Sequence, residues 1–282
     1  MSLSAVLAQH ARRIALPCLL ALLAQSAQAE LMLHPTRVVF DKNHRAAQVE
    51  LINNSKDAAT YRITLVNRRM TDDGQFVAVD QAQPGELFAD PMLRYSPRQI
   101  TLAPGTAQTV RLMLRKPAVL ADGEYRSHLH FEKLPDAKGS TSIEARGQAG
   151  ADIGVMLNAL VGASMPVIVR HGATAATVGL SNLALHKGGA GRAPMLSLQF
   201  DRGGNSSVYG DLQVTFTPPG GAAQVLASAG GVAVYSPNLL RRVSLPLQVP
   251  AGMTLARGAL NVVFRHRAEA GGGVIAQAAL PL

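Results

Sequence analysis

Polar and apolar residues alternate in short runs along most of the chain. The clearest runs are residues 48–53, 61–67, 109–114 and 125–131. Because successive side chains of a β-strand point to opposite faces, this two-residue period predicts strands with one buried face. Turn pairs such as Asp73-Gly74 and Pro104-Gly105 separate the runs. Strong helical periodicity is absent after residue 29, so we expect an all-β chain made of antiparallel sandwiches.

An interruption of this pattern divides the chain into two parts. Residues 135–150 are polar and contain Gly and Ser, and the apolar run 153–169 that follows is unusually long for one strand. A boundary is expected just after it, since the β pattern then resumes with glycine-rich turns. We therefore predict two β-sandwich domains, residues 30–170 and 171–282, each large enough to bury its own core.

The first 29 residues have the features of a secretion signal. Arg12 and Arg13 precede an apolar run, and Ala27-Gln28-Ala29 gives the small-x-small pattern of a cleavage site. That run is shorter than the roughly 20 apolar residues of a membrane span, and no later segment is long enough, so we expect an exported chain that is not membrane-embedded. Cys18 is the only cysteine and is lost with the signal, which excludes thiol catalysis, an internal disulfide and cysteine-based metal sites.

The charge balance narrows the class of partner. The chain carries 27 Lys and Arg against 18 Asp and Glu, a formal net charge of +9. These cations are scattered rather than clustered, and few aromatic residues stand beside them, which argues against nucleic acid as a partner. The positive charge instead favours attraction of another protein.

Five segments of the first predicted domain resemble the periplasmic chaperones of the chaperone–usher pilus pathway, the PapD-like family. They are residues 34–41 (HPTRVVFD), 49–54 (VELINN), 95–105 (YSPRQITLAPG), 108–112 (QTVRL) and 124–129 (EYRSHL). Each is weak alone, but their order and spacing cover residues 31–169. The second predicted domain matches only in length, β character and position.

The resemblance implies a fold and a mechanism. The fold is two immunoglobulin-like β-sandwich domains in an L or boomerang arrangement, and the location is the periplasm. A pilus subunit lacks the last strand of its own immunoglobulin-like domain. A chaperone of this family lends the missing strand, holds the folded subunit and passes it to an outer-membrane usher. The partners implied are therefore pilus subunits and an usher.

The long apolar run supplies the expected donor strand. Five of its residues alternate and share one face of a strand: Ile153, Val155, Leu157, Ala159 and Val161. An ordinary buried core strand would give the same apolar run, and the sequence alone leaves that alternative open. The resemblance and the polar stretch before the run favour the donor strand. An exposed apolar strand would also allow unloaded copies to associate.

The resemblance also implies an anchor for the C-terminal carboxylate of the subunit. Arg37 occupies the place of the family's anchoring arginine, and a guanidinium offers paired donors that match a carboxylate. The well-known members have a second anchor, a lysine, where this chain has Pro166. We expect Arg126, on the neighbouring predicted strand, to take that role, with Arg170 and Arg115 as weaker options.

Enzyme signals are poor. His128 and His130 alternate on one predicted strand but lack a third metal ligand at a persuasive spacing, so we interpret them as polar residues of a strand face. The sequence has no Gly-x-Ser-x-Gly elbow and no phosphate-binding glycine loop. We expect no catalytic residue, metal or cofactor. Two alternatives remain: a secreted immunoglobulin-like structural or adhesion subunit, and a β-sandwich hydrolase or carbohydrate-binding protein.

Overall fold

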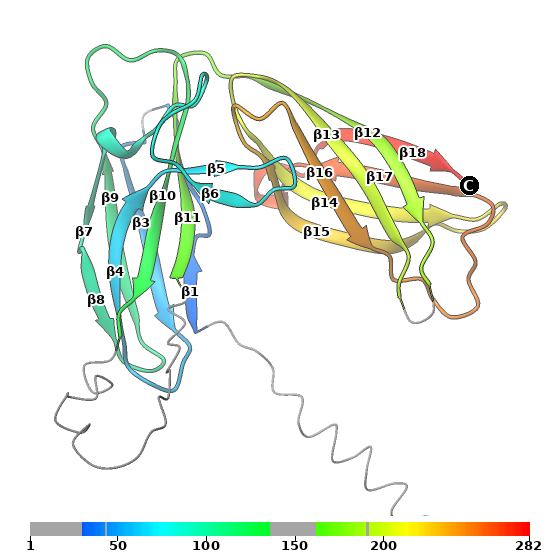
Figure 1. Cartoon of the computed structure of the whole chain (residues 1–282), viewed down its shortest axis with the longest axis horizontal. Coiled ribbons are helices and arrows are strands. Elements are labelled where there is room, and N and C mark those ends of the chain that lie inside the picture. The colour runs from blue at the N-terminus through cyan, green and yellow to red at the C-terminus, as the bar shows by residue number, and fades with distance from the viewer. Residues whose placement is uncertain (1–29, 43, 136–161, 190–191) are drawn as a thin grey trace, which may run out of the picture.

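The computed structural model describes residues 30–42, 44–135, 162–189 and 192–282. The predicted signal segment, residues 1–29, and the predicted donor residues 153–161 lie outside the described residues. Figure 1 shows two β-sandwiches set at an angle to each other. The prediction of an all-β, two-sandwich fold in a bent arrangement is confirmed.

The first sandwich has two facing sheets. One sheet has the order β1 (Leu31–His34), β3 (Ala46–Asn53), β9 (Ala107–Leu114) and β7 (Leu93–Ser96). The other has the order β2 (Val38–Phe40), β11 (Gly162–His171), β10 (Gly123–Lys133), β4 (Ala59–Val66) and β8 (Gln99–Leu102). A short 3-10 helix, η1 (Asp90–Met92), precedes β7. The four alternating runs found in the sequence fall on β3, β4, β9 and β10.

Alternation along these strands builds the first core. Val49 and Leu51 of β3 are fully buried, whereas Glu50 between them is exposed. Leu129 and Phe131 of β10 are fully buried from the opposite sheet. The apolar faces of both sheets therefore meet in one core, as expected for a two-residue period with one buried face.

The second sandwich follows from residue 176 onward. One sheet has the order β12 (Ala176–His186), β13 (Met195–Gly204) and β16 (Leu240–Pro246). The other has the order β15 (Gln224–Val234), β14 (Val208–Thr217), β17 (Ala259–Arg265) and β18 (Val274–Pro281), with a short 3-10 helix, η3 (Ala268–Ala270), before β18. Phe200 of β13 and Phe264 of β17 pack edge to face across this core with ring centroids 5.0 Å apart.

A small hairpin of the first sandwich packs on the second. The hairpin consists of β5 (Arg68–Met70) and β6 (Phe76–Ala78), and Figure 1 shows it extending from the first sandwich toward the second. Met70 is 1% exposed and belongs to the core of the second sandwich. Its carbonyl accepts a hydrogen bond of 2.8 Å from the Asn238 side chain, and the carbonyl of Asp72 accepts one of 2.6 Å from the backbone N–H of Arg242. The hairpin thus fixes one sandwich to the other.

A side chain at Gly74 in the hairpin turn would displace the guanidinium of Arg241. Its φ is +85°, and a Cβ there would lie 2.5 Å from Nε of Arg241, a side chain that itself donates to the carbonyl of Ala233. Gly74→Ala is therefore expected to lower the free energy of unfolding by about 1–2 kcal/mol for the left-handed backbone alone, and by more because Arg241 must move.

Gly105→Ala is the matched control for this substitution, measured by urea denaturation. Gly105 also has a positive φ, +67°, but a Cβ there would meet nothing within 4 Å. Equal losses of stability in the two variants would show that the contact between the hairpin and Arg241 contributes nothing.

Candidate functional site

Arg37 faces the second sandwich. It precedes β2, whose Val38 and Phe40 enter the first core, while Val39 packs against the second. Arg37 shares the face of Val39 because side chains alternate along the strand. The Cζ atom of Arg37 lies 4.1 Å from the ring centroid of Tyr209, a residue of β14. The predicted anchor is therefore located at the junction between the sandwiches.

Arg126 lies at the same junction. It is on β10, on the face opposite to that of Leu129, and its side chain is largely buried, with 7% of the residue exposed. Its Cζ atom lies 4.3 Å from the ring centroid of Tyr235, just after β15, and Nη2 donates a hydrogen bond of 3.2 Å to the carbonyl of Arg68. The sequence-based expectation that Arg126 neighbours the strand after the donor segment is correct, because β10 pairs with β11.

His128 is a junction residue that the sequence-based interpretation did not select. It was interpreted as a polar residue on a strand face, but only 2% of it is exposed. The ring of Phe76, from the hairpin, lies edge-on with its centroid 5.0 Å away. Every second position of β10 is occupied by an ionisable residue: Glu124, Arg126, His128 and His130. This row was the sequence signal for the junction face.

These residues present an unusual number of buried donors without acceptors. We call Arg37, Arg68, Arg126 and His128 the junction cluster. Within the described residues, no partner is found for Nε and Nη1 of Arg37, Nε of Arg68, Nε and Nη1 of Arg126, or either ring nitrogen of His128. Each unsatisfied buried polar group costs about 1–3 kcal/mol, and more if charged. An anion that accepted these hydrogen bonds would remove much of that cost.

Burial changes the proton affinity of the cluster. Desolvation is the largest cause that lowers the pKa of Arg37 and of Arg126 below the usual value for arginine. Burial, followed by the positive charges of Arg126 and Arg68, lowers the pKa of His128 from 6.5 to about 3. His128 is therefore neutral at neutral pH, whereas the arginines, whose pKa starts far above 7, keep their charge.

The nearby acid is already engaged by other groups. Glu124 is buried, and its carboxylate accepts hydrogen bonds of 3.1 Å from Nε of Arg170 and from the backbone N–H of Ser207, and a third from the Ser207 hydroxyl. Arg170 also donates to the Ser207 carbonyl at 3.3 Å. Arg170, a weaker option for the second anchor, thus pairs with Glu124 between the two sandwiches. Arg115, the other option, follows β9 in the far sheet of the first sandwich and is exposed.

Pro166 lies beside the cluster but supplies no donor. It is on β11, and its Cα partner on β10 is His128. On the other side of β11, Val167 pairs with Val38, the residue after Arg37. The position where the family's lysine is expected thus lies on β11, between β2, which Arg37 precedes, and β10, which carries His128.

Neutral His128 has a consequence for stability in acid. Between its usual pKa of 6.5 and its folded-state pKa of about 3, the unfolded chain binds a proton at His128 and the folded chain does not. Stability is therefore lost as the pH falls through this window, by up to about 1.4 kcal/mol per pH unit. His128→Gln is expected to lose less stability than the parent chain between about pH 6.5 and pH 4.5 in urea denaturation. Identical losses in the two proteins would mean that His128 is not held neutral; His186→Gln is the exposed control.

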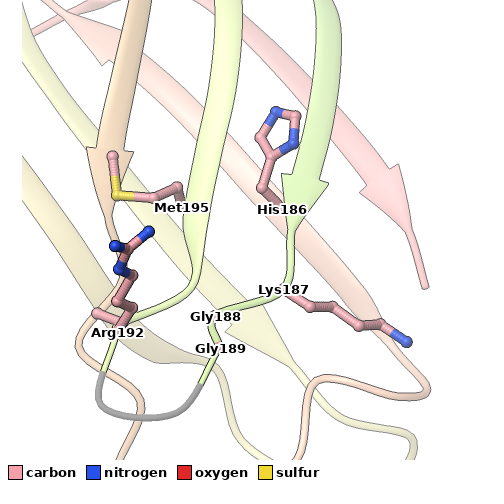
Figure 2. A pocket seen from close by; sticks show the side chains of 7 residues that line it. His186, Lys187, Gly188, Gly189, Arg192 and Met195 are labelled. Carbon is pink, nitrogen blue, oxygen red and sulfur yellow. The ribbon is translucent and has the colours of Figure 1, made fainter.

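A pocket in the second sandwich is a weaker candidate. It lies at the end of the β12–β13 hairpin and is lined by His186, Lys187, Arg192 and Met195 with two glycines and Ala193. Figure 2 shows the Lys187 side chain pointing away from His186 and from Arg192, so the three polar side chains do not converge on one point. Within the described ranges, no group of three His, Cys, Asp or Glu is placed to hold a metal, and no helix could span a membrane.

Comparison with known proteins identifies the family. The family model for the pili and flagellar-assembly chaperone, PapD N-terminal domain, matches residues 30–170. No curated protein sequence matches the chain. The solved structure of the chaperone YadV is 12% identical, with a TM-score of 0.43, and covers 90% of this chain and 100% of its own. The solved structure of the Salmonella enterica SafA pilin in complex with the SafB chaperone is 15% identical, with a TM-score of 0.41. It covers 92% of this chain and 99% of its own.

The family match covers half of the chain and includes β1 to β11, with Arg37, Arg126 and His128. The matched family consists of chaperones rather than enzymes. The match therefore favours a chaperone over the alternative of a structural or adhesion subunit. The chain belongs to the pili and flagellar-assembly chaperone family.

Proposed function

We propose that the chain holds pilus subunits in the periplasm by lending them residues 153–161 as a strand, before an outer-membrane usher takes them. The observation that supports this most directly is the open edge of β11. Residues 162–171 of β11 pair with β10, whereas β2 pairs only with residues 167–169. Within the described residues, the first half of β11 thus has a neighbour on one side only. A strand that continued from this edge could add to the sheet of another protein.

The strand and the anchor act together in this proposal. Residues 30–170 form the subunit-binding domain and residues 171–282 the second domain, which contributes Tyr209 and Tyr235 to the junction. The unsatisfied donors of Arg37 and Arg126 bind the C-terminal carboxylate of the subunit, which sets the register of the added strand. Such a polar anchor is needed to fix the register, because strand pairing alone allows one strand to slip along the other.

Co-expression with the pilin encoded nearest to this gene tests the strand. Leu157→Asp is expected to prevent recovery of a one-to-one complex from the periplasm, because it removes about 1.5–3 kcal/mol of apolar burial and places a carboxylate in the groove. Asn158→Asp adds the same charge on the opposite face of the predicted strand and should leave the complex largely intact. Equal recovery with both variants would rule out insertion of this face.

A further inference from the structure

The buried side chain of His128 lacks the hydrogen-bond partners that a buried imidazole requires. Only 2% of the residue is exposed, and neither Nδ1 nor Nε2 has a hydrogen-bond partner within the described residues. The great majority of buried side-chain polar atoms in proteins have a partner. Two unpartnered nitrogens on one buried ring therefore point to a group that binds there and lies outside the described residues.

The surroundings of His128 define the charge of that group. Arg126 on its own strand and Arg68 on β5 are the charged residues that act on it. Phe76 of β6 packs against the ring, and the strand partners of His128 are Pro166 of β11 and Val66 of β4. These three neighbours are uncharged. Two acids, Glu124 and Glu86, act on Arg126, but their carboxylates are already paired with Arg170 and Arg69. The two guanidinium groups beside His128 therefore favour an anion as the missing partner.

The same environment fixes what His128 can offer to an anion. Burial and the two arginines hold the pKa of the imidazole at about 3, so the ring is neutral near pH 7. A neutral imidazole carries one N–H donor and one acceptor nitrogen. It can therefore donate one hydrogen bond without adding a fourth positive charge to the junction cluster.

We propose that His128 is the third donor to the carboxylate that Arg37 and Arg126 bind. This inference rests on the proposed function, because the carboxylate is that of the subunit's C-terminus. The three donors come from the approach to β2 and from two positions of β10 that share one face, so they fix the carboxylate from different directions. A carboxylate accepts from all three donors, whereas a C-terminal amide would direct its own N–H groups at two cations. His128 thereby contributes to the choice of a free chain end.

Sodium acetate is a suitable probe because it carries the carboxylate alone. The exported chain, labelled with ¹⁵N, is titrated with acetate at neutral pH and followed by NMR at the histidine ring nitrogens and the arginine Nε groups. Acetamide and sodium chloride at matched concentrations are the controls. We expect saturable shifts at His128, Arg37 and Arg126 with acetate only, and the His128 ring should remain neutral at saturation.

The titration separates failure of this inference from failure of the proposed anchor. Shifts at Arg37 and Arg126 without a shift at His128 would overturn the role of His128 and leave the anchor in place. An absence of shifts at all three residues would overturn the anchor, and the role of His128 with it. Protonation of the His128 ring on acetate binding would also overturn the proposal of a neutral donor.

Two substitutions test the hydrogen bond itself. His128→Phe keeps a flat ring without a donor and should weaken acetate binding about tenfold, whereas His128→Gln keeps an N–H donor and should weaken it less. His186→Phe, in the second sandwich, should bind as the parent chain does. Acetate affinity of His128→Phe equal to that of the parent would overturn the proposal, provided that thermal denaturation shows a folded variant.

Discussion

Replacing Arg37 with alanine is expected to eliminate recovery of the complex with a pilus subunit. Two buried donors of this guanidinium, Nε and Nη1, have no acceptor within the described residues, so a carboxylate could accept from both. A hydrogen bond between charged groups contributes about 1.5–3 kcal/mol, which corresponds to roughly a ten- to hundredfold loss of affinity for each bond removed. Periplasmic co-expression followed by purification of the chaperone measures the effect.

Arg37→Ala should lower the stability of the free chaperone much less than it lowers the affinity for the subunit. The unsatisfied donors of Arg37 are a cost to the folded state, offset in part by the stacking of the guanidinium on Tyr209 at 4.1 Å. Arg37→Ala is therefore expected to change the free energy of unfolding by less than about 1 kcal/mol while binding is lost. This combination distinguishes a binding residue from a structural one.

A matched variant controls for the loss of positive charge. Arg111 is exposed on β9, on the other sheet of the first sandwich, and Arg111→Ala removes the same charge from the same domain. It should leave recovery of the complex unchanged. If Arg111→Ala reduced recovery as much as Arg37→Ala, the effect of Arg37 would be general charge attraction rather than a positioned anchor.

The strands were predictable because a two-residue period is a property of the local sequence. Val49 and Leu51 point into the core as their alternation indicates, and the same holds for Leu129 and Phe131. The pattern shows which face of a strand is buried but does not show what covers it. For that reason the arrangement within the first sandwich could be predicted more fully than the junction between the two sandwiches.

The junction depends on contacts between distant segments. Met70 and Ile168 belong by sequence to the first sandwich, yet both are buried in the core of the second. His128 alternates with apolar residues and so was interpreted as a residue of a polar strand face, but the hairpin and the second sandwich bury that face. Arg126 lies beside β11, as strand pairing alone indicated, and its role as second anchor stays a prediction. The described residues do not include 153–161, so the donor strand stays a prediction.

Replacing Glu124 with alanine is expected to loosen the junction and to cause a large loss of stability. The Glu124 side chain is 1% exposed and connects Arg170, near the end of β11, to Ser207, just before β14 of the second sandwich. Removal leaves the Arg170 guanidinium without its ion pair and the backbone N–H of Ser207 without an acceptor. Breaking a buried ion pair costs about 3–5 kcal/mol, and the lower end applies here because the Arg170 side chain is 31% exposed.

Urea denaturation and small-angle X-ray scattering measure the two parts of this prediction. The free energy of unfolding should fall by about 3 kcal/mol, and the scattering curve should show a broader range of angles between the sandwiches. Glu132→Ala is the control on the same strand: its carboxylate pairs with Arg62 at 3.6 Å, and both side chains are at least 40% exposed, so that pair should contribute less than about 1 kcal/mol. If Glu124→Ala had the same free energy of unfolding and the same scattering curve as Glu132→Ala, the buried ion pair would not set the angle between the sandwiches. The angle would then depend on Met70, Ile168 and the hairpin, whose apolar burial does not involve Glu124.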